Sequence, residues 1–211
     1  DFQTLKIIDE EAKRCHKIIQ GLMEFARPTP VTPQTTDVGA LIAKTLKMID
    51  ARLYKQKVGL TESVAPHLPP IHADAQQLEQ VLVNLYLNAL DAMLGGGHLT
   101  VRAQLDGNGD FSKEVVISVA DTGHGMPRED LAKIFQPFFT ARKKAGMGLG
   151  LSICQTIAQN HGGSLRLAKT AVDGCVFELA LPFAATSPGG DGKHSLGHDP
   201  EKRTPVFGKD Q

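Results

Sequence analysis

The sequence has no excess of either charge. Lysine and arginine together number 23 among the 211 residues, and aspartate and glutamate also number 23. A balanced chain has no long-range field that would attract nucleic acid or acidic lipid. We therefore predict no nucleic-acid partner, and any site for a phosphate must be built locally.

Cysteines and long apolar runs are also scarce. Cys15, Cys154 and Cys175 are widely spaced and form no C-x-x-C pair, which argues against a disulfide framework or a zinc site. No apolar run approaches the ~18 residues that a membrane-spanning helix needs, and the first residues do not have the pattern of a signal peptide. We predict a cytoplasmic protein with reduced thiols, which contacts a membrane only through regions outside this sequence.

Two common nucleotide motifs are missing. The pattern G-x-x-x-x-G-K-[ST] of P-loop proteins does not occur, and no strand immediately precedes the glycine-rich stretch at 146–150. A dinucleotide-binding fingerprint requires such a strand. Both of these nucleotide folds are therefore disfavoured.

The N-terminal segment has the pattern of a long helix. Apolar residues recur in steps of three and four from Leu5 to Ala26, which predicts an apolar seam along one helix. A lone helix cannot bury such a seam, so we predict a helical partner, for example in a homodimer. Prolines and a change in composition then divide the chain into a helix at 1–28, a linker at 29–36, a main domain at 37–183 and a disordered tail at 184–211.

The main domain alternates helical and strand patterns. Asp37 is a suitable N-cap for its first helix, and short helical pieces are expected after Pro127. The order predicts an α+β sandwich, with helices on one face of a mixed, mostly antiparallel sheet. The predicted helices are 37–56, 73–93 and 148–161, and the predicted strands are 57–64, 98–105, 115–120, 164–168 and 175–181, with a turn at 106–109.

Two stretches carry polar groups suited to a nucleotide. Asn84, Asn88 and Asp91 project from one face of the helix at 73–93, and an amide oxygen is a good ligand for Mg²⁺. The alternative is that these amides cap neighbouring loops. The stretch 121–126 places the carboxylate of Asp121 at a strand end, where it could accept the amino group of adenine; an ordinary Asp-Gly turn is the alternative.

Two further stretches are suited to phosphates. Glycines at 146–150 open the helix at 148–161, and backbone amides at a helix N-terminus can face an anion. Before them, 135–140 is an apolar hinge, and 141–145 carries three cations that would suit a mobile lid over a triphosphate. A solvated charge run beside an aromatic cluster is the alternative.

In this order the four stretches resemble a known family. Over about 37–182 the sequence is similar to the ATP-binding domain of histidine kinases, within the gyrase, heat-shock chaperone, histidine kinase and mismatch-repair superfamily that shares the Bergerat fold. The resemblance makes 84–89 the N box, 121–125 the first glycine box, 134–140 the F box and 146–150 the second glycine box. The short lid is similar to that of nitrogen-regulatory kinases.

The resemblance implies ATP and Mg²⁺ as cofactors. Asn88 would ligate Mg²⁺, Asp121 would hold the adenine amino group, and Arg142 or Lys143 would contact the phosphates. The implied catalytic residues are Asn84, Asn88, Arg142 and Lys143. The implied nucleotide-binding residues are Asn88, Asp91, Asp121, Gly123, Gly125, Met126, Phe135, Phe139, Thr140, Arg142, Lys143, Gly146, Gly148, Leu149, Gly150 and Leu151.

One residue favours phosphoryl transfer over hydrolysis. ATPases of the superfamily carry a glutamate one helical turn before the metal-binding asparagine, and this chain has Asn84 there. An amide cannot take a proton from water at neutral pH, and Glu79 is expected on another side of the helix. Kinase chemistry relies on positioning and charge neutralisation instead. A Bergerat ATPase, a serine-directed kinase of the anti-sigma type and a non-catalytic relative remain the alternatives.

The phosphate acceptor is expected outside this sequence. The resemblance implies transfer to a histidine on the first helix of a dimerisation hairpin, then to the aspartate of a response regulator receiver domain. No segment matches the His-Glu-Leu-Arg motif of that helix, and residues 7–28 resemble the second helix. His16 is a weak candidate because Lys17, and not an acidic residue, stands beside it.

Overall fold

The computed structural model describes residue 9 and residues 32–106, 114–140, 148–171 and 174–183. Several predictions lie outside this part of the chain: the N-terminal helix with His16, the turn after residue 106, the tail, and the mobile lid with Arg142, Lys143 and Gly146.

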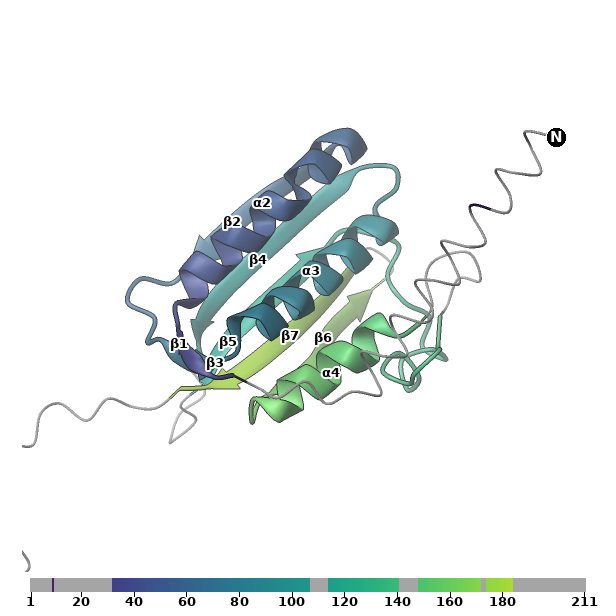
Figure 1. Ribbon diagram of the computed structural model, residues 1–211. Coiled ribbons are helices and arrows are strands. Elements are labelled where there is room, and N and C mark those ends of the chain that lie inside the picture. The colour runs from purple at the N-terminus through teal and green to yellow at the C-terminus, as the bar shows by residue number, and fades with distance from the viewer. Residues whose placement is uncertain (1–8, 10–31, 107–113, 141–147, 172–173, 184–211) are drawn as a thin grey trace, which may run out of the picture.

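The centre of the fold is a five-stranded sheet in the order β2-β4-β5-β7-β6. β2 and β4 are parallel, and the other neighbours are antiparallel. The helices lie on one face of this sheet (Figure 1), so the predicted α+β sandwich is confirmed. The strands are β2 (Val58–Val64), β4 (Gly97–Leu105), β5 (Glu114–Asp121), β6 (Ser164–Ala171) and β7 (Gly174–Pro182).

Helices α2 (Val38–Gln56) and α3 (Ala75–Ala92) begin at aspartate caps. The Asp37 side chain accepts a hydrogen bond of 2.9 Å from the amide of Ala40, as the N-cap prediction requires. Asp74 accepts from two amides in the first turn of α3. These hydrogen bonds satisfy first-turn amides that have no partner within the helix. Because Asp74 is the N-cap, α3 begins at Ala75, two residues later than predicted.

The core lies between the helices and the sheet. On β5, Val115, Ile117 and Val119 alternate with less buried residues and are at most 2% exposed. They pack with the apolar faces of α2, α3 and α4 (Gly150–Asn160). This alternation is the pattern of a sheet with one face on the core. Strands β5 and β7 both contact α3 on that face.

A small two-stranded sheet joins the start of the domain to α3. β1 (Gln34–Thr36) pairs antiparallel with β3 (Ile71–Ala73). Both strands have three residues, too few for a periodic pattern to be recognised, and β1 lies within the range predicted as linker. The Thr36 hydroxyl donates a 3.2 Å bond to the carbonyl oxygen of Ala73, which attaches this segment next to the N-cap of α3.

The helical pieces expected after Pro127 do not form. Residues 128–137 instead make successive turns, in which Asp130 N bonds to the carbonyl of Pro127 and Lys133 N bonds to that of Asp130. Each bond spans three residues, so the chain turns repeatedly without an α-helical ladder. The strand predicted at 164–168 is also longer in the structure, because β6 continues past a register shift between Leu167 and Lys169.

His161 joins the end of α4 to the start of α3. The amide of Asp74 donates to His161 Nε2 at 3.0 Å. Because Nε2 accepts, the ring hydrogen is on Nδ1, which donates to the carbonyl oxygen of Ile157 at 2.8 Å. The imidazole therefore bridges the two helices whose other ends face the cavity described below.

We expect His161→Ala to lower the free energy of unfolding by about 1–3 kcal/mol, because it leaves the partly buried amide of Asp74 without a partner. Urea unfolding followed by circular dichroism measures this. His72→Ala, which removes an exposed histidine of β3, is the control and should change stability little. Equal losses in both variants would contradict the bridging role.

Candidate functional site

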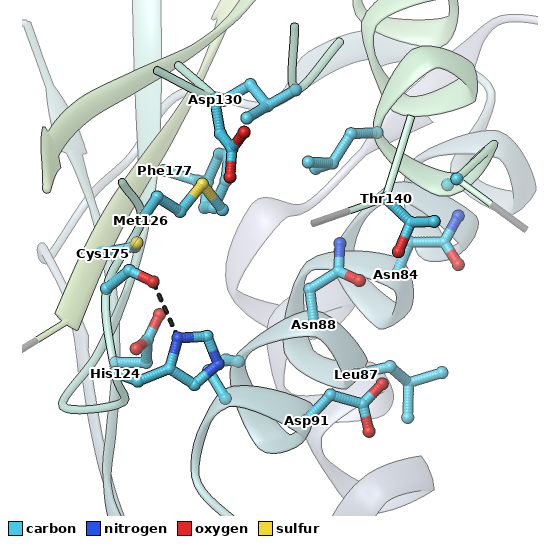
Figure 2. Close-up of a pocket in the computed structure, with 18 of the residues that line it drawn as sticks. Asn84, Leu87, Asn88, Asp91, His124, Met126, Asp130, Thr140, Cys175 and Phe177 are labelled. Carbon is cyan, nitrogen blue, oxygen red and sulfur yellow. Dashed lines mark hydrogen bonds between the residues drawn. The ribbon is translucent and has the colours of Figure 1, made fainter. Parts of the chain in front are cut away.

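A cavity of about 370 Å³ opens between α3, the segment after β5, the start of α4 and β7 (Figure 2). Its lining residues are Asn84, Leu87, Asn88, Ala89, Asp91, Ala92, Asp121, His124, Gly125, Met126, Asp130, Ile134, Phe139, Thr140, Gly148, Gly150, Leu151, Cys175 and Phe177.

α3 presents its polar face to this cavity. Asn84, Asn88 and Asp91 all line it, so the predicted common face is confirmed. Asn84 hydrogen-bonds the buried thiol of Cys154 on α4, whose pKa burial raises to about 12. Asp91 forms an ion pair with Arg52 of α2. Asn88 is exposed, and its amide is open to a ligand.

Asp121 lies at the end of β5, with its carboxylate at the cavity. Its Oδ1 accepts a 2.8 Å hydrogen bond from the amide of Gly123. Burial raises the pKa of Asp121, while backbone hydrogen bonds from Gly123 and Cys175 and the charge of His124 oppose that rise. The carboxylate is thus partly desolvated, and it retains acceptor capacity for a donor inside the cavity.

Gly174 allows β5 and β7 to approach closely at this point. A Cβ on Gly174, whose φ is +135°, would lie 1.9 Å from the carbonyl oxygen of Asp121. A side chain there would separate the strands. The close approach brings Cys175 and Phe177 of β7 into the cavity wall beside Asp121.

The second glycine box packs directly on the F box. Gly148 has a φ of +69°, and a Cβ there would lie 2.3 Å from the carbonyl oxygen of Phe139. α4 then starts at Gly150, and among the described residues no side chain caps it. Unlike α2 and α3, this helix therefore offers uncapped first-turn amides at a cavity wall, which is the arrangement that favours an anion.

The structure brings together most, but not all, of the predicted nucleotide-binding residues that it describes. Gly123, Phe135 and Leu149 do not line the cavity: Gly123 donates to Asp121, Phe135 lines a neighbouring groove beside β6, and Leu149 is buried in the core. Glu79 pairs with Lys44 of α2, away from the cavity as expected. The lining residues not predicted are Leu87, Ala89, Ala92, His124, Asp130, Ile134, Cys175 and Phe177.

The family follows from this arrangement and from comparison with known proteins. Residues 73–185 match the family described as histidine kinase-, DNA gyrase B-, and HSP90-like ATPase. The chain belongs to this family. It is 35% identical over 184 residues to the sensor histidine kinase ZraS of Escherichia coli K12, covering 87% of this chain and 38% of ZraS. It is 35% identical over 192 residues to the sensor kinase CckA of Brucella abortus, and this match covers 86% of this chain and 20% of CckA.

Solved histidine kinases share the fold. The catalytic domain of ThkA is 29% identical with a TM-score of 0.62, covering 71% of this chain and 97% of that domain. ThkA in complex with the response regulator TrrA has a TM-score of 0.70 at 26% identity, and the match covers 86% of this chain and 51% of that ThkA chain. ShkA in complex with AMPPNP has the same fold, with a TM-score of 0.74 at 24% identity. The match covers 88% of this chain and 39% of ShkA.

The domain is therefore an ATP-binding catalytic domain of the sensor histidine kinase type. The chain spans well under half the length of the ZraS and CckA proteins that it matches. No helix in the described part of the chain is both long and apolar enough to cross a membrane.

Proposed function

We propose that this protein transfers the γ-phosphoryl group of Mg²⁺-bound ATP to a histidine on a separate helical segment, for relay to a response regulator. The observation that supports transfer over hydrolysis is Asn84. This amide stands one helical turn before Asn88, and it makes a hydrogen bond with the Cys154 thiol. The cavity therefore has no proton acceptor for water at that position.

ATP would lie across the cavity with adenine at Asp121. The carboxylate would accept the exocyclic amino group, and Phe177 and Met126 would supply apolar contact nearby. The phosphates would then extend toward Asn88 and the uncapped start of α4 at Gly150, where amides and the helix dipole favour negative charge.

The oxygen donors at this end fit Mg²⁺. The ion prefers oxygen ligands and is usually held by few protein groups together with phosphates and water. We propose Asn88, exposed at the cavity wall, as the protein ligand. Bound Mg²⁺ would neutralise charge on the β- and γ-phosphates.

This chain's own residues would act by positioning. Asp121 and the α4 amides would fix the two ends of the nucleotide, and Arg142 and Lys143 are proposed to contact its phosphates. Asp130, a lining carboxylate, lies away from Asn84 and Asn88 (Figure 2). It is therefore poorly placed as a base at the γ-phosphate, which also favours transfer over hydrolysis.

The partners follow from the same proposal. ThkA, a similar histidine kinase, forms a complex with the response regulator TrrA, and we propose a receiver domain as the partner of this protein. We also propose a cytoplasmic homodimer through residues 1–28, which the sequence predicts to be helical; this would bring an acceptor histidine to the cavity.

We expect Asn88→Ala to reduce phosphorylation by at least about 100-fold, because one metal ligand at the transferring phosphates is lost. The reaction contains labelled ATP, Mg²⁺, this protein and a separately supplied histidine-bearing helical hairpin. Gln76→Ala, which removes an exposed amide of the same helix away from the cavity, is the matched control and should retain full activity.

The chemistry of the product separates the alternatives. Acid-labile label on the hairpin supports the kinase proposal, whereas phosphate release without labelled protein would identify an ATPase. Acid-stable label on serine would identify a serine-directed kinase. Either of the last two results would refute the proposed reaction.

A further inference from the structure

His124 stands between the two glycines of the first glycine box, at a position for which the motif requires no particular residue. Its ring is exposed and lines the cavity. Figure 2 shows the imidazole projecting into the cavity toward the part of α3 that carries Asn88 and Asp91.

The ring of His124 is oriented by its own loop. Its Nδ1 lies 2.8 Å from the carbonyl oxygen of Gly125. A carbonyl oxygen only accepts, so Nδ1 carries the hydrogen and Nε2 is the nitrogen available to a ligand. Among the described residues, nothing hydrogen-bonds Nε2.

The charged side chains around the cavity indicate what Nε2 of His124 could bind. Asp91, Asp121 and Asp130 line the cavity, and its described lining contains no lysine or arginine. Arg52 pairs with Asp91 from outside the lining. Within this described lining, His124 is the side chain of a basic residue type. The electrostatic effect of His124 on the neighbouring carboxylate opposes the rise in the pKa of Asp121 that burial causes.

We propose that His124 contacts the phosphate chain of the bound nucleotide, with protonated Nε2 donating to a phosphate oxygen. This inference rests on the proposed function, in which Asp121 marks the adenine end and Asn88 the metal end. His124 follows Asp121 by three residues and lines the same cavity as Asn88, so its ring can face the phosphates that join the two ends. Charge-assisted hydrogen bonds of this kind are among the stronger ones in proteins.

The test compares adenosine, AMP and ADP by calorimetry in the presence of Mg²⁺. We expect His124→Ala to bind adenosine within about twofold of wild type and ADP about tenfold more weakly, which is the effect of one charge-assisted hydrogen bond. AMP would show the loss if the contact is to the first phosphate. His124→Gln keeps a neutral donor and should recover part of the ADP affinity. His72→Ala, an exposed histidine outside the cavity, should match wild type.

An equal loss for adenosine and ADP would place His124 at the base and overturn the inference, as would an unchanged ADP affinity in His124→Ala. If wild type bound none of these ligands, the proposed function itself would fail. Binding that is lost in Asp121→Asn but unaffected in His124→Ala would overturn only the inference about His124.

Discussion

Asp121→Asn is expected to weaken ATP and ADP binding by at least about 100-fold, because the substituted amide can turn a donor toward the donating amino group of adenine and leave it without an acceptor. The fold should tolerate the change. An asparagine oxygen can still accept a hydrogen bond from the amide of Gly123, whose nitrogen lies 2.8 Å from Asp121 Oδ1.

The same substitution should not destabilise the nucleotide-free domain at neutral pH. Burial raises the pKa of Asp121 in the folded state, so between the ordinary carboxyl pKa and that raised value the folded protein holds a proton that the unfolded chain has released. The free energy of unfolding therefore falls as pH rises through this interval. At pH values above the raised pKa, burial of the ionised carboxylate lowers the free energy of unfolding, and a neutral asparagine does not have this cost.

Two measurements on one pair of proteins test this. Calorimetry with Mg²⁺ and ADP measures the affinity, and urea unfolding at several pH values measures the stability. The difference in stability between Asp121→Asn and wild type should shrink as the pH falls through the raised pKa. As the pH falls through the same interval and the carboxylate takes up a proton, the affinity of the wild-type protein for ADP should also fall. Unchanged affinity in Asp121→Asn would refute the adenine assignment.

Long periodic elements were predictable from the sequence. Helices α2, α3 and α4 each bury one regular apolar stripe, and Asp37 is the cap that its residue type suggested. The common face of Asn84, Asn88 and Asp91 follows from helical geometry alone. In each case local residue spacing determines the result, and tertiary contacts do not change it.

Features that depend on tertiary contacts were not predictable in the same way. Cys175 and Phe177 reach the cavity because β7 pairs with β5, a contact between residues far apart in the chain. Leu149 stands between two glycines of a binding motif, yet it packs into the core. The ion pair between Asp91 and Arg52 also joins separate helices, and no local pattern indicates it.

Glycines of the second glycine box should differ sharply in what they tolerate. Gly148→Ala is expected to lower the free energy of unfolding by more than about 2 kcal/mol, because a left-handed φ disfavours any side chain. The added Cβ would also stand 2.3 Å from the Phe139 carbonyl oxygen. The F box would have to move away from the cavity, and nucleotide affinity should fall with stability.

Gly150→Ala is the matched control. A Cβ there meets nothing within 4 Å. Alanine in place of glycine stabilises a helix interior by roughly 0.5–1 kcal/mol, and we expect no more than this at the first residue of α4. Gly150 lines the cavity, so the added methyl group would occupy space proposed for phosphate. We therefore expect this variant to keep or gain stability while binding Mg²⁺ and ADP more weakly, and adenosine with little change. Urea unfolding and calorimetry on both variants separate the two effects. A Gly148→Ala protein as stable as Gly150→Ala would show that the F box and the second glycine box are not packed together in this way.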